Sequence, residues 1–291
     1  MPSLKEYKTK IQSLSNIEKI TRTMKLVSAS KLRQVQHTQA QAKKYERQLK
    51  AMIARLSASV ESASHPLLVK QQAVKNILIV VITSDKGLCG GFNNNLSRKV
   101  AAWIKTKKDI FSKIDLSFCG KRGFMFFKNS GRVKHHYEGV TARPDFLKAV
   151  QIGEELSRFF MAVEYDEIYL AFNRFNNSLS QTPVLQKILP MEEESLREEK
   201  EAKPFSADYI FEPDQDELLK AILPNYLYFE IYFALLENSA GEHGARMTAM
   251  ENASKNAKEF IELYTLLRNR ARQAAITKEL IEVVSGAQAL Q

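Results

Sequence analysis

Residues 250–291 constrain the fold of this chain more than any other segment. Apolar or small side chains recur there in steps of three and four, at Met250, Ala253, Ala257, Phe260, Tyr264, Leu267, Ala271 and Ala274. This spacing is the heptad seam of a coiled coil, and Ile281 and Val284 keep the same frame. Because residues 245–285 contain neither Pro nor Gly, the pattern predicts one long helix whose seam packs against another long helix.

The opposite end of the chain supplies the expected partner helix. Residues 1–60 contain no Gly, and apolar residues again recur at Leu4, Tyr7, Ile11, Leu14, Ile17, Ile20, Met24 and Val27. Leu32 and Val35 are out of step with them, which predicts a stutter. A helix of about sixty residues spans roughly 90 Å, and one over residues 214–288 roughly 110 Å. We expect residues 1–65 and 213–291 to form a long antiparallel two-helix coiled coil; two helices of a compact bundle are the alternative.

The formal charge of +10 is carried by the N-terminal helix alone. Residues 1–60 hold thirteen Lys and Arg against three Asp and Glu, and the remaining residues hold thirty of each sign. A basic helix is typical of a solvated face, a nucleic-acid contact or an acidic protein partner. The segment has two aromatic residues, Tyr7 and Tyr45, and no nucleic-acid-binding motif, so an acidic protein surface is favoured over nucleic acid.

The remaining composition argues against several classes of protein. Two cysteines, Cys89 and Cys119, provide neither a disulfide framework nor a metal cluster, which suits a reducing compartment. No apolar stretch approaches the ~20 residues of a membrane span. Helix patterning begins at once, without the features of a signal or transit peptide. Any association with a membrane is therefore expected to occur through partners.

Between the two helices the pattern changes to alternating strands and helices. The run N-I-L-I-V-V-I-T at residues 76–83 is typical of a strand buried on both faces. Further strands are expected at 115–119, 132–137, 167–172 and 182–189, and helices at 96–111, 120–128 and 146–163. This alternation predicts a mostly parallel, doubly wound, Rossmann-like α/β domain over residues 75–210, inserted between the halves of the coiled coil.

A Gly-rich segment, Ser84–Asn93 (S-D-K-G-L-C-G-G-F-N), follows the first strand directly. Gly-rich turns between a strand and a helix hold phosphates in dinucleotide-binding folds. This segment matches neither G-x-G-x-x-G nor G-x-x-x-x-G-K-[ST], so a structural or docking loop is favoured. A Rossmann-like nucleotide-binding enzyme that uses Gly87–Gly91 is the alternative function.

Other candidate chemistry is sparse. Cys89 lies where a helix N-terminus would favour a thiolate, but no His is near it in sequence, so a buried thiol is favoured over a nucleophile. His135 and His136 are adjacent on an expected strand and would point to opposite faces, which disfavours a shared metal. No catalytic group, metal or cofactor is expected in this chain.

Three segments resemble the gamma subunit of rotary F-type ATP synthases. They are N-I-E-K-I-T-R-T-M-K-L-V-S-A-S-K at residues 16–31, the Gly-rich segment 84–93, and N-R-A-R-Q-A-A-I-T-K-E-L at 269–280, which V-S-G-A follows at 284–287. The resemblance spans the whole chain and is weak through residues 100–200.

The resemblance implies a rotor subunit that is not itself an enzyme. In that family the terminal helices form an asymmetric shaft inside a ring of three alpha and three beta subunits, and the α/β domain contacts the epsilon subunit and the membrane c-ring. Proton flow turns the c-ring and the shaft, which drives each beta site through its binding states. The implied location is the cytoplasmic face of a bacterial plasma membrane, with attachment through partner subunits.

The resemblance also implies which positions meet the partners. Those expected to meet the beta subunits are Met24, Lys25, Arg246, Arg272, Gln273 and Thr277. Those expected to meet epsilon or the c-ring are Asp85, Lys86 and Gly87.

Two glycines depart from the expected continuous helix. Gly241 and Gly244 each cost roughly 1 kcal/mol relative to Ala in a helix interior. Either the shaft is locally compliant at these glycines, or packing compensates for them. Pro224 suggests that the C-terminal helix starts or kinks nearby.

Overall fold

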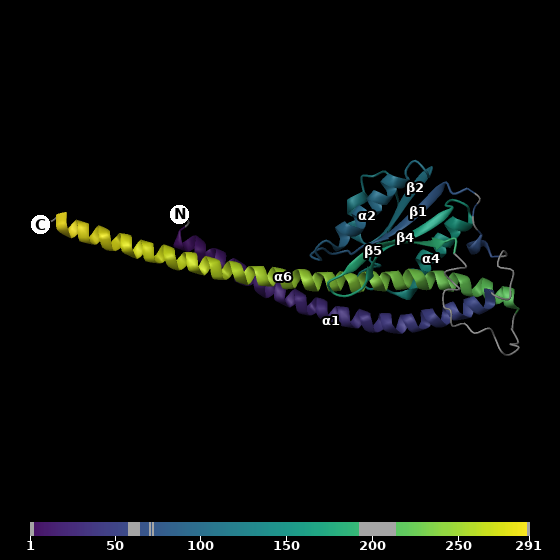
Figure 1. The fold of residues 1–291 in the computed structure, drawn as a ribbon, viewed down its shortest axis with the longest axis horizontal. Coiled ribbons are helices and arrows are strands. Elements are labelled where there is room, and N and C mark those ends of the chain that lie inside the picture. The colour runs from purple at the N-terminus through teal and green to yellow at the C-terminus, as the bar shows by residue number, and fades with distance from the viewer. Residues whose placement is uncertain (1–2, 58–64, 70, 72, 192–213, 290–291) are drawn as a thin grey trace. The chain divides into compact units, whose positions relative to one another are not determined.

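The computed structural model describes residues 3–57, 65–69, 71, 73–191 and 214–289 (Figure 1). It divides into two compact units, residues 1–29 with 246–291 and residues 30–245. The helices are α1 (Leu4–Ser57), η2 (Pro66–Leu68), α2 (Phe92–Lys107), α3 (Lys121–Phe127), α4 (Phe146–Met161) and α6 (Gln215–Ala289). The strands are β1 (Asn76–Ile82), β2 (Lys113–Cys119), β3 (Val133–Tyr137), β4 (Glu167–Phe175) and β5 (Gln181–Leu189). The predicted domain limits at residues 210 and 213 lie outside the described residues.

The two long helices are present as predicted. α1 has 54 residues and α6 has 75. The carboxyl group of Asp214 accepts a hydrogen bond from the backbone N–H of Glu217 at 2.8 Å, which satisfies one of the free donors at the start of α6. Pro224 lies inside α6, so the helix begins before this proline and continues through it.

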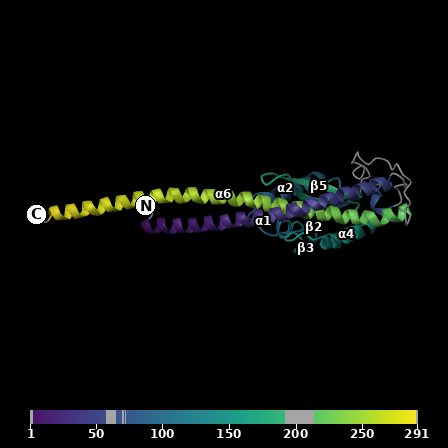
Figure 2. The same cartoon turned by 90° about the horizontal axis from the view of Figure 1, so that it is seen from below.

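In the first unit, α1 and α6 run antiparallel (Figure 2). The rings of Tyr7 and Tyr264 have centroids 6.3 Å apart, and Lys25 Nζ lies 2.6 Å from Glu251 Oε1. Contacts therefore progress along the two helices in opposite directions, as in an antiparallel coiled coil.

Four residues of the predicted apolar seam of α1 are exposed. They are Leu4, Ile17, Ile20 and Val27, at 39%, 45%, 59% and 51%, whereas Thr21 and Ser28 are buried. The inward-facing positions of α1 in this unit are Tyr7, Ile11, Leu14, Glu18, Thr21, Lys25 and Ser28. Small polar residues occupy part of the seam because their hydroxyl groups can be satisfied locally: Thr21 Oγ1 donates to the Ile17 carbonyl at 2.9 Å.

The predicted stutter in α1 is also wrong. Within α1, buried Ser28 is followed four residues later by buried Leu32, and Val35, Gln39, Ala42, Glu46, Leu49 and Ile53 continue the three-and-four spacing as buried or half-buried residues. An inward frame that includes polar residues is therefore regular, and the stutter arose from counting apolar residues alone.

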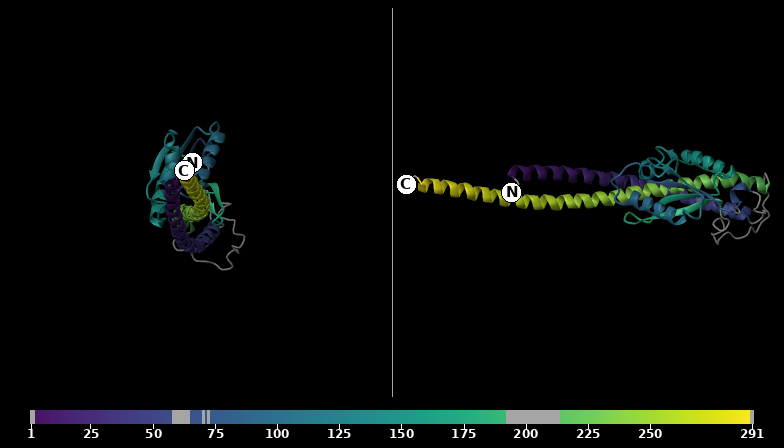
Figure 3. Two further views of the ribbon diagram at one scale, coloured as in Figure 1. Left: turned by 90° about the vertical axis from the view of Figure 1, so that its left-hand side faces the viewer. Right: turned by 90° about the horizontal axis from the view of Figure 1, so that it is seen from above.

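The far end of α6 does not meet another helix of this unit, contrary to the prediction. Ile281 and Val284 are 60% and 48% exposed, and every residue from 276 to 288 is exposed. The reason is length: α1 starts at Leu4, and α6 continues past this start (Figure 3, right). Phe260 is also 51% exposed, since the neighbouring Ile261 takes the inward direction.

The second unit contains a five-stranded sheet in the order β3-β2-β1-β4-β5. Strands β1 to β4 pair in parallel, and β5 pairs antiparallel with β4. The sheet is therefore mostly parallel, as predicted. The helix after β1 begins at Phe92 rather than at the predicted residue 96, directly after the Gly-rich segment.

Both faces of this sheet are covered, which explains the continuous apolar run of β1. Ile77, Ile79 and Val81 pack with side chains of α2 and α3. Leu78, Val80 and Ile82 belong to a second core with side chains of α4, α1 and α6. The arrangement is doubly wound, and the two long helices share the second face with α4. Among the described helices, none combines the length and hydropathy of a membrane span.

Candidate functional site

The two N-terminal candidate residues lie on α1 of the first unit. Met24 is half-buried, and Lys25 Nζ donates to Glu251 Oε1 at 2.6 Å. The side chains of this pair are 35% and 56% exposed. An exposed pair of this kind contributes about 0–1 kcal/mol, so a partner's carboxylate could replace Glu251 at little cost.

Arg246 is more enclosed than a partner-contacting residue was expected to be. Only 7% of its surface is exposed, so its guanidinium group offers little area to another protein in this structure. Its helix continues without interruption to Glu251, the residue that pairs with Lys25.

Arg272, Gln273 and Thr277 are exposed together on the far end of α6. Thr277 Oγ1 donates to the Gln273 carbonyl at 3.0 Å. Large apolar side chains lie uncovered around them, at Ile276, Leu280, Ile281, Val283 and Val284. A contiguous uncovered apolar surface mixed with polar groups is typical of an interaction site.

In the second unit, Asp85 is held by groups of the chain itself. Its Oδ1 accepts from the backbone N–H of Lys121 at 3.0 Å, at the start of α3, and its Oδ2 accepts from Thr141 Oγ1 at 3.1 Å. Its carboxylate thus takes the place that an external anion would occupy at this helix start. A Cβ at Gly87 would lie 2.8 Å from Arg122 Nη2, whereas Lys86 is exposed.

The polar groups of the Gly-rich segment are also bonded internally. Asn93 Oδ1 accepts from the backbone N–H of Ser84 at 2.9 Å, and Asn93 Nδ2 donates to Ser84 Oγ at 2.7 Å and to Cys89 Sγ at 3.2 Å. Cys89 is 2% exposed. A buried thiol that accepts a hydrogen bond is a structural group, and the loop binds its own side chains rather than presenting donors to a phosphate.

The crevice where a Rossmann-like fold binds its ligand is filled by the chain itself. In this strand order the direction of winding reverses between β1 and β4, which is the usual ligand position. Asn173 Nδ2, on β4, donates to the Phe92 carbonyl at 3.2 Å, and a Cβ at Gly241 would lie 2.8 Å from Phe92 Cε2. Since α6 occupies this position, the geometry does not favour the alternative of a nucleotide-binding enzyme.

The two helix glycines are explained by packing rather than by compliance. A Cβ at Gly244 would lie 3.2 Å from Phe175 Cε2 and 3.2 Å from Ser178 Cα, so β4 and the loop that follows it approach the helix backbone closely. Gly241 and Gly244 therefore create a notch in α6, and any residue with a side chain at these two positions would fill it.

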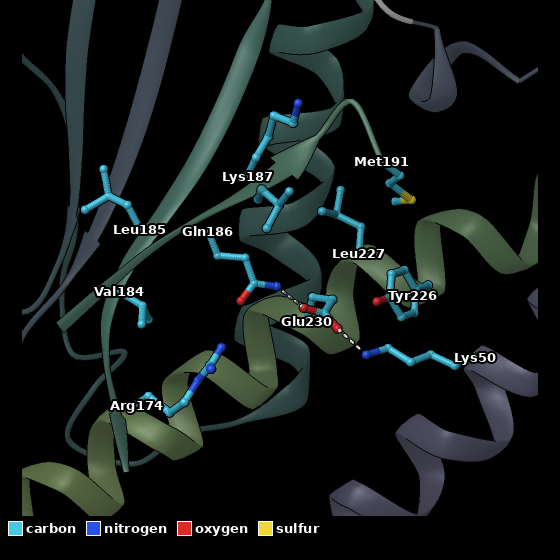
Figure 4. Close-up of a pocket in the computed structure, with 11 residues that line it drawn as sticks. Lys50, Arg174, Val184, Leu185, Gln186, Lys187, Met191, Tyr226, Leu227 and Glu230 are labelled. Carbon is cyan, nitrogen blue, oxygen red and sulfur yellow. Dashed lines mark hydrogen bonds and ion pairs between the residues drawn. The ribbon is translucent and has the colours of Figure 1, made fainter. Parts of the chain in front are cut away.

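Beside β5 lies a cavity of about 450 Å3 (Figure 4). Its lining is Lys50, Arg174, Val184, Leu185, Gln186, Lys187, Ile188, Met191, Tyr226, Leu227 and Glu230. Glu230 Oε2 accepts from Gln186 Nε2 at 3.0 Å, and Glu230 Oε1 lies 3.9 Å from Lys50 Nζ. Burial raises the pKa of Glu230, and the charge of Lys50 partly opposes this rise.

A second carboxyl group lies one heptad further along α6. Glu237 is 7% exposed, accepts from the backbone N–H of Phe175 at 2.5 Å and accepts from Gln39 Nε2. Burial raises the pKa of Glu237, and these two hydrogen bonds oppose the rise. Sequence reasoning missed both glutamates, although two acidic residues seven apart in the largely apolar stretch 226–240 were a visible signal.

The two histidines of β3 lie against different aromatic rings. The His136 ring stacks on Phe124 with centroids 4.5 Å apart, and His135 lies against Tyr137 at 4.4 Å. Within the part of the chain that the structure describes, no group of three or more His, Cys, Asp or Glu residues is arranged to hold a metal ion.

Comparisons with known proteins match the whole chain. A family model described as ATP synthase matches residues 3–290. The chain is 43% identical to an ATP synthase gamma chain from Geobacter metallireducens and 41% identical to one from Trichlorobacter lovleyi, over the full length of both chains in each case.

Solved structures show the same fold. A chain of the Tetrahymena thermophila mitochondrial ATP synthase, from a structure of its central stalk and c-ring, matches with a TM-score of 0.60 and 25% identity over 81% of this chain and 99% of that chain. A chain of the Euglena gracilis mitochondrial ATP synthase, from a structure of OSCP, F1 and c-ring, matches with a TM-score of 0.66 and 19% identity over 99% and 94%.

Proposed function

We propose a function from one premise: this chain belongs to the ATP synthase family, and its relatives are ATP synthase gamma chains. The chain is the central rotor shaft of an F-type ATP synthase. It couples proton-driven rotation of the membrane c-ring to the conformational cycle of the catalytic sites on the beta subunits. The chain itself performs no catalysis, binds no cofactor and acts through its contacts.

The exposed end of α6 is the observation that carries this proposal. Residues 276–288 form a helix that is exposed throughout, and their large apolar side chains need cover from another protein. A ring of alpha and beta subunits around the helix would supply that cover, and Arg272, Gln273 and Thr277 would then face the beta subunits. Met24 and Lys25 would meet acidic loops of the same subunits, and Arg246 would reach them through the 7% of its surface that is exposed.

The α/β domain is proposed to meet the c-ring and the epsilon subunit. The similar Tetrahymena thermophila chain comes from a structure of a central stalk together with a c-ring, which supports the first of these partners. Asp85, Lys86 and Gly87 are proposed to lie at this interface, with exposed Lys86 and Leu88 offering side chains to it. The proposed location is the cytoplasmic face of a bacterial plasma membrane, and the proposed organisation is residues 1–65 and 213–291 as shaft and 75–210 as foot.

The test is recovery of the tagged chain from its native membranes, with partners identified by mass. We expect alpha, beta, epsilon and c subunits to be recovered together with ATPase activity. Recovery of the chain alone, or with nucleic acid, would contradict the proposal. Saturable nucleotide binding by the isolated chain that Gly90→Val abolishes would restore the Rossmann-like alternative.

A further inference from the structure

We propose that one face of α6, formed by Glu230, Glu237, Gly241 and Gly244, is a seat that holds the β4–β5 hairpin and α1 in fixed register, so that torque on the α/β domain reaches both long helices. This inference rests on the proposed rotor function and names the residues that position its parts. The four residues are spaced by seven, four and three positions, which places them along one side of a helix.

Each glutamate of the seat joins three elements. Glu230 bonds Gln186 of β5 at 3.0 Å and pairs with Lys50 of α1 at 3.9 Å. Glu237 bonds the backbone N–H of Phe175 in β4 at 2.5 Å and also accepts from Gln39 of α1. At each of two levels, one heptad apart, a carboxyl group of α6 therefore contacts both the hairpin and α1.

The Glu237 bridge lies where water cannot replace it easily, whereas Glu230 and its two partners line the cavity beside β5. Glu237 is 7% exposed, and the side chain of Glu230 is 14% exposed. Separating the hairpin from α6 would leave buried donors and acceptors unsatisfied, so the bridges resist sliding more than apolar contacts, which are non-directional. Their geometry fixes a register rather than only an attraction.

The two glycines let the start of α2 and the loop after β4 approach the backbone of α6. A Cβ at position 241 would lie 2.8 Å from Phe92 Cε2, and a Cβ at position 244 would lie 3.2 Å from Ser178 Cα. Every residue of α6 from 234 to 244 is buried, so this stretch is enclosed within the second unit. The ring of Phe92 and the loop after β4 fit into the notch and block movement along the helix.

The experiment uses the assembled ATP synthase in vesicles, with this chain restored to a complex that lacks it. The measured quantity is ATP-driven proton uptake divided by ATP hydrolysed. We expect Glu237→Ala and Gly244→Val to lower this ratio about two- to threefold at normal subunit content, which is the lower end of the effects found at positions that modulate coupling. Glu237→Gln, which keeps an acceptor for Phe175, should retain most of the ratio.

The matched control is Glu217→Ala, which removes an exposed carboxylate from the same helix. It should leave the ratio unchanged. Normal ratios in both Glu237→Ala and Gly244→Val would overturn the inference. Failure of the unmodified chain to restore ATPase activity would instead overturn the proposed function, so the two failures are distinguishable.

A milder variant covers the case in which those variants do not assemble. Gly241→Ala leaves both glutamates in place and should lower the ratio, and Phe92→Leu in the same chain should restore it by removing ring atoms that the new methyl group meets. A normal ratio for Gly241→Ala, or its failure to assemble, would count against a role in torque transfer.

Discussion

Gly241→Ala distinguishes a packing role for this glycine from simple helix propensity. On propensity alone, Ala in a helix interior is more stable than Gly by roughly 1 kcal/mol. The added methyl group, however, would lie 2.8 Å from Phe92 Cε2, and Phe92 is 4% exposed, so the ring has little room to move. The two effects therefore have opposite signs, and the measured sign decides between them.

The expected net change is a loss of stability. Inserting a methyl group into a well-packed core costs typically about 1–3 kcal/mol, which exceeds the gain in propensity. We expect Gly241→Ala to lower the free energy of unfolding by about 1 kcal/mol. For a domain of roughly 200 residues this corresponds to about 2–4 °C in Tm.

The chain has one tryptophan, which makes the assay specific to the α/β domain. Trp103 lies on α2, the helix that begins at Phe92, and stacks with Phe111 at 6.1 Å. Urea unfolding is followed by Trp103 fluorescence and by far-ultraviolet circular dichroism. Phe92→Leu combined with Gly241→Ala should recover part of the loss, since the smaller side chain relieves the contact.

Gly286→Ala is the matched control, because it is the same substitution in the same helix with nothing within 4 Å of the new Cβ. It should gain helical signal or leave it unchanged. If Gly241→Ala proved as stable as the unmodified chain or more stable, the Phe92 ring would be shown to yield, and the notch would carry no packing constraint.

Three further outcomes follow from the same contacts. The pKa values of Glu230 and Glu237 are raised from 4.5, so the folded chain keeps protons that the unfolded chain releases, and the stability that these groups contribute falls as pH rises above about 4.5. The double variant Glu230→Gln with Glu237→Gln should therefore show a flatter dependence of the urea midpoint on pH between pH 5 and 8. An unchanged dependence on pH would refute this prediction. The double variant Lys25→Glu with Glu251→Lys restores the ion pair in reversed order, so the helix pair should keep its melting temperature. ATP synthesis should nevertheless fall if Lys25 acts on acidic partner loops. Normal synthesis would argue against that role. Asn238 is fully buried, and its amide has no hydrogen-bond partner among the described residues. Asn238→Leu should therefore raise the free energy of unfolding by about 1 kcal/mol. A lower free energy of unfolding, measured in urea, would indicate a partner for the amide.

The order and type of the elements could be predicted because each has a strong local signal. The run at residues 76–83 is apolar on both faces, and the structure buries it between two cores. The terminal helices were predictable because long stretches without Gly or Pro carry a regular spacing of apolar residues. The start of α2 was predicted too late because the Gly-rich segment masks a helix that begins directly after Gly91.

The exact inward face of α1 could not be predicted from apolar residues. Thr21 and Ser28 are buried whereas Ile20 is 59% exposed, an order that hydropathy alone reverses. Small hydroxyl side chains satisfy themselves on the helix backbone and allow close approach, and the cost of an exposed isoleucine falls where another protein covers it. The sequence alone does not show which side chains another protein covers, so apolar spacing assigned the inward face of α1 to the wrong residues.

The bridges of Glu230 and Glu237 were unpredictable for a different reason, since each depends on residues far away in the chain. Gln39 and Phe175 lie 198 and 62 positions from Glu237, and only the fold brings them to one carboxyl group. The candidate site residues drawn from the family resemblance stay predictions, because partner contacts are formed with other chains.

The Gly-rich segment and the helix glycines are two parts of one arrangement. A loop between a strand and a helix at the point where the sheet reverses direction ordinarily leaves a crevice for a ligand. Here Asn93 bonds the loop to itself, Asn173 holds the start of α2, and Gly241 lets the backbone of α6 reach Phe92. The glycines that weaken an isolated helix therefore allow that helix to fill the crevice. Rossmann-like folds bind a small molecule at this edge of the sheet, whereas this chain packs its own helix α6 there. A rotor needs such a contact between its α/β domain and its long helices.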